Sequence, residues 1–269
     1  MVFVLRTLVF ASGLAAALFT AWPVQARQLR ACADPNNLPF SNDRHEGFEN
    51  KIAELIAREL KATLTYTWWA QRRGFLRNTL NTGRCDLVTG TAYGVEALRV
   101  TRPYYRSGFV FVTRKNGPNI ESLNDPILRT LKIGVQLVGD DGANPPPVHA
   151  LARRGIIGNV RGYSVYGDYR DATPGATIIT AVAESEIDVA IVWGPVAGFF
   201  AQRAKVPLDV RPVTPQADGP RLPMVFDITM GVRRDNMALR DELNALLIRL
   251  QPQIDAILSD YGVPRLDRR

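Results

Sequence analysis

Three segments that leave predicted strands carry the side chains that could bind or transform a small molecule. They read DPNNLPF (34–40), TAYG (91–94) and GVQLVGDDGANPPP (134–147). A glycine turn that opens a helix offers free backbone N–H groups to an anion. The third segment has such a turn, but Asp140 and Asp141 lie in it, and their negative charge would repel an anion. The turn therefore has the form of an anion site and a charge that opposes anions.

A catalytic site has weak support in the sequence. His45 and Glu46 could act as an acid and base pair, but they lie in a loop before Gly47, where a His beside a Glu is usually solvated surface. The chain has no nucleophile elbow, P-loop or zinc motif. The segment GDDGAN also lacks the alternating acids and the final Glu of a calcium loop. We therefore expect no catalytic activity, no metal and no cofactor.

Residues 1–26 have the pattern of an export signal. Arg6 precedes an apolar run that ends in the letters VQA, which suits a signal peptidase that cuts after Ala26. We expect a periplasmic protein after this cleavage. The alternative is a retained membrane anchor, which needs roughly 20 apolar residues, and Pro23 and Gln25 interrupt this run. No later segment is apolar for long enough to cross a bilayer, so the mature protein is expected to be soluble, without a membrane contact.

Length and charge limit the class of protein further. Removing 26 of the 269 residues leaves 243, and removing Arg6 lowers the net charge from +7 to +6. This length suits one large domain or two small ones. The basic side chains form isolated pairs instead of one stripe, so we expect no nucleic acid partner, whereas distributed charge favours encounter with an acidic protein. The pairs are Arg72-Arg73, Arg153-Arg154, Arg233-Arg234 and Arg268-Arg269.

The chain has two cysteines, Cys32 and Cys85. An even count in an exported chain favours a disulfide, whereas a metal site would need clustered Cys and His. The alternative is two buried thiols, because free Cys often serves as a small core residue. His45 and His149 are far apart in the sequence, and neither belongs to a metal motif.

Short β-branched runs alternate with helical spacing from residue 29 onward. Ile52, Leu55 and Ile56, for example, give one segment an apolar helical face. Such alternation implies a parallel sheet with helices on its faces, and these sheets bind ligands beyond the carboxyl ends of their strands. The predicted strands are 29–34, 63–69, 85–90, 107–115, 131–136, 187–193, 207–215 and 224–234. The predicted helices are 47–62, 72–83, 147–155, 176–185, 194–204 and 235–261.

The order of several motifs resembles the type II periplasmic solute-binding proteins across nearly the whole mature chain. These motifs are DPNNLPF, GFENKIAELIAREL, TRPYY, KIGVQ and EIDVAIVWGPVAGFF. The resemblance implies a bilobal α/β fold, in which two α/β lobes joined by a double crossover hinge close around a cleft. It places the first lobe at 27–111 and 225–269 and the second lobe at 112–224. The strand order of this family also makes the strands of Cys32 and Cys85 parallel neighbours, which would bring the two sulfurs to disulfide distance.

A more specific set of phrases resembles the MxaJ/XoxJ group, the binding-protein-like accessories of periplasmic quinoprotein methanol dehydrogenases. The phrases are CADPNNLPFSN, QRRGFLRNTLNTGRCD, TRPYYRS, GVQLVGDDGANPPP, ARRGI and VYGDYR, and they favour the XoxJ branch. The resemblance implies a non-catalytic monomer that interacts with a PQQ-dependent methanol or alcohol dehydrogenase, lanthanide-dependent enzymes included. It also implies the cytochrome c of that enzyme as a further partner, and a role in activation or maturation of the dehydrogenase in methanol oxidation.

Three features by which amino-acid receptors of this fold hold their ligand are altered in this chain. Gly94 stands where such receptors place an Arg that grips the ligand carboxylate through two hydrogen bonds. Arg99 and Arg102 lie nearby, where capping a helix or facing solvent is the simpler role. Trp193 stands where an Asp meets the ligand ammonium; it would fill the cleft, stack on a flat group or belong to the core. The acidic turn is the third change, so amino-acid capture is not expected.

Two functions follow from these observations. The first is an interaction protein that engages the dehydrogenase through the cleft or its rims, since aromatic side chains are common anchors of interfaces. The alternative is an ABC-transporter receptor for a small uncharged or cationic ligand, whose positive group would meet acids while aromatic rings stack on it. The candidate cleft residues are Asp34, Asn36, Asn37, Phe40, Trp68, Trp69, Gln71, Tyr93, Gly139, Asp140, Asp141 and Trp193.

Overall fold

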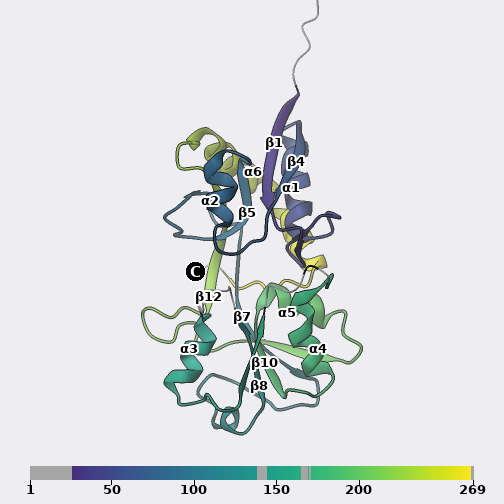
Figure 1. Cartoon of the computed structure of the whole chain (residues 1–269), viewed down its shortest axis with the longest axis vertical. Helices are drawn as coiled ribbons and strands as arrows, with labels where there is room; N and C mark the ends of the chain where they lie inside the picture. Colours follow the sequence, from purple (N-terminus) through teal and green to yellow (C-terminus); the bar gives the residue numbers. More distant parts are fainter. Residues whose placement is uncertain (1–25, 138–143, 165–168, 170, 268–269) are drawn as a thin grey trace, which may run out of the picture.

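Two α/β lobes lie one above the other along the long axis of the molecule, and two long strands run between them (Figure 1). These strands are β7 (Tyr105–Arg114) and β12 (Val225–Val232). This computed structural model describes residues 26–137, 144–164, 169 and 171–267.

The first lobe is built on a sheet in which β1 lies between two parallel neighbours, β4 and β5, and β12 runs antiparallel beside β5. Its other strands are β1 (Arg27–Ala33), β4 (Ala62–Trp68), β5 (Leu87–Ala92), the short β6 (Arg99–Val100), and a hairpin of β2 (Asn36–Asn37) and β3 (Ser41–Asn42). Its helices are α1 (Phe48–Glu59), α2 (Phe75–Asn78), η1 (Leu80–Thr82) and α6 (Met237–Asp260).

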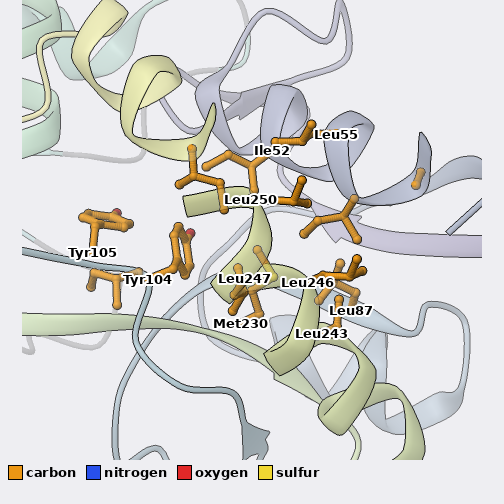
Figure 2. Close-up of a cluster of buried hydrophobic side chains, with 14 of the residues drawn as sticks. Ile52, Leu55, Leu87, Tyr104, Tyr105, Met230, Leu243, Leu246, Leu247 and Leu250 are labelled. Atoms are coloured by element: carbon orange, nitrogen blue, oxygen red, sulfur yellow. The ribbon is translucent and has the colours of Figure 1, made fainter. Parts of the chain in front are cut away.

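The core of this lobe lies where α1 and α6 pack against the sheet. Figure 2 shows Ile52 and Leu55 of α1 beside Leu250 of α6, with Leu246 of α6 close to Leu87 of β5. All five side chains are buried. The apolar spacing predicted for 47–62 therefore faces the core, and burial of these side chains holds the two helices on the sheet.

The helix predicted at 72–83 was wrong in its extent. Gly74 has a φ of 89°, which places it outside a right-handed helix, so α2 begins only at Phe75. Thr79 is also non-helical and divides α2 from η1. The Thr79 hydroxyl donates to the Phe75 carbonyl at 2.7 Å and satisfies an acceptor that a continuous helix would have paired with a backbone N–H.

The second lobe has β10 at its centre, parallel to β8 and antiparallel to β7. Its strands are β8 (Ile133–Leu137), β9 (Val160–Ser164), β10 (Val189–Trp193) and β11 (Leu208–Pro212). Its helices are η2 (Pro126–Arg129), α3 (Pro146–Arg153), η3 (Pro174–Ala176), α4 (Thr177–Ala183) and α5 (Gly194–Ala201). The edge strand β9 was not predicted, because its pattern VRGYS has one buried side chain and no apolar alternation.

The crossing between the lobes takes place inside the strands. Residues Tyr105 to Gly108 of β7 pair with β12, and the residues from Phe109 onward pair with β10 of the second lobe. After α6 the chain runs back along this junction, where the Ser107 hydroxyl donates to the Pro264 carbonyl at 2.6 Å. The first lobe thus contains chain from two separate parts of the sequence, whereas the elements of the second lobe follow one another along the chain.

The predicted disulfide is present. Cys32 of β1 is bonded to Cys85, which lies two residues before β5, and the Cα atoms are 5.5 Å apart. The two strands are parallel neighbours, with Ala31 opposite Leu87. The bond is buried in a small apolar cluster with Phe75 of α2 and Leu80 of η1, and it ties the segment that follows them to the inner strand β1.

The longest described helix, α6, contains Pro252, and its buried side chains are all leucine or isoleucine. Within the described residues, no helix combines the length and apolarity that crossing a membrane requires.

Candidate functional site

A cavity of about 480 Å³ lies between the lobes, at the carboxyl ends of β5, β8 and β10. This is where open α/β sheets bind ligands. Side chains of both lobes and of the crossing strands line it. Its aromatic lining is Phe40, Tyr105, Phe109, Trp193 and Phe226. The remaining lining residues are Asn37, Glu49, Gln71, Gly90, Thr91, Ala92, Val95, Gln136, Val196 and Ile228.

Trp193 is held in place at the end of β10. Its ring meets Phe109 edge-on with centroids 5.5 Å apart and meets Phe226 edge-on at 5.8 Å. The buried Gln136 side chain accepts the Trp193 backbone N–H at 2.8 Å. The indole therefore forms a fixed aromatic wall that joins the second lobe to the crossing strand β12.

Glu49 is the one charged residue among the described residues that line the cavity. It lies in the first turn of α1, and its carboxyl group packs directly on β5: a Cβ atom placed on Gly90 would lie 1.9 Å from Oε1. A side chain at Gly90 would therefore displace the carboxyl group. In the described part of the chain, no hydrogen bond or ion pair joins this carboxyl to a partner, and burial raises the pKa of Glu49 from its ordinary value of 4.5 to about 8.

Three tyrosines lie close enough to Glu49 for its charge to act on them. Burial raises the pKa of Tyr66 to about 12 and raises the pKa values of Tyr104 and Tyr105 well above their ordinary range. The negative charge of Glu49 adds to these changes in the same direction. All three phenols therefore stay neutral at physiological pH and leave the charge of the cavity to Glu49.

Asp34 supports the wall of the cavity and does not line it. Its buried carboxylate accepts the backbone N–H of Asn36 at 2.8 Å and that of Gln71 at 2.7 Å. The Tyr169 hydroxyl from the second lobe donates to the same carboxylate at 3.2 Å. Asp34 thus fixes two loops next to the cavity, and its lone pairs are used within the protein.

The asparagines of the same segment have two different positions. The Asn36 side chain donates to the Asp171 carbonyl of the second lobe at 2.7 Å, so it bridges the lobes outside the cavity. Asn37 lines the cavity with Gln71, and its amide donates to the Gln71 side chain at 3.1 Å.

The remaining aromatic candidates are not among the residues that line the cavity. Trp68 stacks on Tyr66 of the same strand, with centroids 4.5 Å apart. Trp69 is 37% exposed and lies near the Arg84 guanidinium, and Tyr93 is 64% exposed. Gly139, Asp140 and Asp141 lie outside the described residues. Of the twelve candidates, Asn37, Phe40, Gln71 and Trp193 line the cavity.

Sequence reasoning missed Glu49, Tyr105, Phe109, Gln136 and Phe226. An acid in the first turn of a helix is common because it interacts favourably with the helix dipole. The position of Glu49 in the sequence therefore did not indicate a role in the cavity. The informative residue was Gly90, because a glycine inside a strand often marks a close approach of another group.

The described lining of the cavity has no basic side chain that could hold a carboxylate. Among its described lining residues there is no Arg, Lys or His. Gly94 has a φ of 88° and no atom within 4 Å of the place where a Cβ would lie, so this position faces open space. Among the described residues, no group of three or more His, Cys, Asp or Glu side chains could hold a metal ion.

Two α/β lobes that share crossing strands and enclose a cavity define a two-lobed binding protein, the type II periplasmic binding protein fold. Residues 29–263 match the bacterial extracellular solute-binding proteins, family 3, and the chain belongs to this family.

Relatives of known name cover most of the chain. The chain is 30% identical to Protein MoxJ of Methylorubrum extorquens over 251 residues. This aligned region covers 90% of this chain and 82% of that protein. The crystal structure of the periplasmic binding protein XoxJ from Methylobacterium extorquens AM1 is 38% identical, with a TM-score of 0.73 over 89% of this chain and 100% of that chain. The crystal structure of MxaJ from Methlophaga aminisulfidivorans MPT is 25% identical, with a TM-score of 0.75 over the same shares.

Proposed function

We propose that this protein is a non-catalytic periplasmic accessory protein that binds a PQQ-dependent methanol or alcohol dehydrogenase and supports its activation or maturation. The similarity to MoxJ, XoxJ and MxaJ over nearly the whole chain supports the link to methanol oxidation. The higher identity to XoxJ than to MxaJ supports the XoxJ branch, and with it a lanthanide-dependent enzyme. The cytochrome c of that enzyme is the second partner in this proposal.

The observation that carries this proposal is the chemistry of the cavity. A receptor for free amino acids needs a guanidinium for the carboxylate and an acid for the ammonium at fixed places. Gly94 and Trp193 occupy those two places, and no basic residue is among the described lining. The described residues keep the two lobes without a guanidinium or an acid at those two places, which fits a protein that no longer binds free amino acids.

The rim of the cavity offers a contact surface for a protein. Tyr93 directly follows the lining residues Thr91 and Ala92 and is 64% exposed. A Tyr supplies a large contact area at a low cost in side-chain entropy. The net positive charge of the chain would also speed its encounter with an acidic enzyme.

The test uses the purified mature protein and the purified dehydrogenase. We expect a complex in native mass spectrometry at low salt and a change in dehydrogenase activity when the protein is added. Tyr93→Ala should weaken the complex, whereas Ile248→Ala, on the outer face of α6 with 61% exposure, serves as the matched control. Clean separation of the two proteins together with unchanged activity would refute the proposal.

A further inference from the structure

We propose that the cavity between the lobes binds a small organic ammonium ion, with Glu49 facing its charge and aromatic rings enclosing its apolar part. This site does not depend on the dehydrogenase partnership. It rests on the residues of the cavity, and it is tested without any partner protein.

The charge of the cavity is the first argument. Glu49 has no ion-pair partner among the described residues, and no Arg, Lys or His lines the cavity with it. A carboxyl group enclosed by protein is disfavoured in its charged form unless a cation or several donors stabilise it. An ammonium ion in the cavity would supply the missing partner.

The aromatic lining is the second argument. Rings from the first lobe, the second lobe and both crossing strands meet at the cavity, and the faces of such rings attract cations. Phe109, Trp193 and Phe226 contact one another edge-on, so their orientation is fixed before a ligand arrives. A fixed set of rings beside one carboxylate is the arrangement that recognises quaternary or alkylated ammonium groups.

The described lining of the cavity has no basic side chain for an anion, and this narrows the class of ligand. A zwitterion would bring a carboxylate into a cavity whose described lining offers no guanidinium or ammonium group. Where Glu49 is ionised, its negative charge would also repel that carboxylate. The structure therefore favours a monocation over an amino acid or a betaine.

Binding of a cation should release a proton. Glu49, with a pKa of about 8, is mostly protonated at pH 7, and a neighbouring cation favours the carboxylate form. The titratable groups near Glu49 on other elements are Tyr66 of β4, Tyr104 directly before β7 and Tyr105 at the start of β7, and all three remain neutral. On α1 itself, Lys51 and Glu54 pair with each other at 3.3 Å on the outer face. The affinity should therefore rise by about tenfold per pH unit below pH 8.

Calorimetry with matched probes tests the site. Choline is the cation, 3,3-dimethyl-1-butanol is its neutral isostere, and glycine betaine adds a carboxylate. Phenethylammonium is a second monocation of different shape. We expect at least one ammonium probe to bind the mature protein, with choline at least about tenfold tighter than its isostere and betaine. Titration in two buffers of different ionisation enthalpy should show release of close to one proton per cation at pH 7.

Variants locate the charge. Glu49→Gln keeps the shape of the side chain and should remove the preference for the cation while leaving the neutral isostere unaffected. Gly90→Ala should have a similar effect, because its Cβ would displace the carboxyl group. Glu54→Gln removes an acid from the outer face of the same helix and should change nothing. Equal binding of choline and its isostere, a preference that survives in Glu49→Gln, or no binding of any ammonium probe at pH 8.5 would each overturn the proposal.

Discussion

Replacing Glu49 with Gln should change how the stability of the protein depends on pH. In the folded state the pKa of Glu49 is raised from 4.5 to about 8, whereas in the unfolded chain the carboxyl ionises at its ordinary pKa. Between these two values the folded state binds more protons than the unfolded state, so the free energy of unfolding falls as the pH rises. Gln does not ionise, so the variant lacks this loss.

The size of the effect follows from the two pKa values. They differ by about 3.5 pH units, and each unit corresponds to about 1.36 kcal/mol. The variant should therefore gain on the order of 5 kcal/mol relative to the wild type between pH 4.5 and pH 8, and about 3 kcal/mol of this by pH 7.

Urea denaturation at pH 5, 7 and 8.5 measures this difference, with Glu54→Gln as the control on the exposed face of α1. Glu54 contacts Lys51 and is partly exposed, so its replacement should shift stability by less than about 1 kcal/mol at every pH. A difference between Glu49→Gln and the wild type that stays constant within about 0.5 kcal/mol across this range would refute the reasoning, because the carboxyl would then be solvated.

Three further predictions concern the supports of the site. Asp34→Ala should lower the free energy of unfolding by about 3 kcal/mol in urea titrations, because two backbone N–H groups lose a charged acceptor. Asp34→Asn should lower it by less, and a loss below about 0.5 kcal/mol in Asp34→Ala would contradict this role. Replacing both Cys32 and Cys85 with Ala should lower the free energy of unfolding in the same titrations by about 4 kcal/mol, because the disulfide closes a loop across a sequence separation of 53. A loss of less than about 1 kcal/mol would argue against a stabilising role of the disulfide. Trp193→Asp combined with Gly94→Arg should not create glutamate binding in calorimetry, because an Arg at position 94 is strained at a φ of 88° and no other basic side chain is among the described lining of the cavity. Micromolar binding of glutamate would contradict this expectation.

The alternation of strands and helices was readable from the sequence because most elements have a buried face. The apolar spacing of α1 and the β-branched runs of β8 and β10 reflect contacts with the core, which local patterns record. The segment 72–83 was misread because a backbone conformation at Gly74, not apolar spacing, decides where its helix begins. The edge strand β9 was also missed. Its pairing with β8 depends on backbone hydrogen bonds and little on its side chains, so the sequence pattern does not record it.

The candidate site was harder to predict because a side chain near a strand end can point in several directions. Trp193 lies at the last position of β10 and faces the cavity, whereas Trp68 at the last position of β4 packs on Tyr66 instead. Asp34 has the chemistry of a ligand-binding acid, yet the backbone of its own loop and of Gln71 takes up its oxygens. Only the packing of α1 against β5 reveals that Glu49, and not Asp34, brings a free carboxyl group into the cavity.

A bound cation and a protein partner would use different parts of the molecule and could still influence each other. Asn36 and Asp34 contact Asp171 and Tyr169 across the lobes beside the cavity, so the spacing of the rims and the shape of the cavity depend on the same segments. A ligand that favours one spacing shifts the population of that spacing. Thermodynamic linkage makes such an influence reciprocal. If the cation changes the affinity for the dehydrogenase by some factor, the dehydrogenase changes the affinity for the cation by the same factor. Titrating choline with and without the dehydrogenase measures this coupling, and identical affinities would show that the partner contacts a surface whose position the cavity does not control.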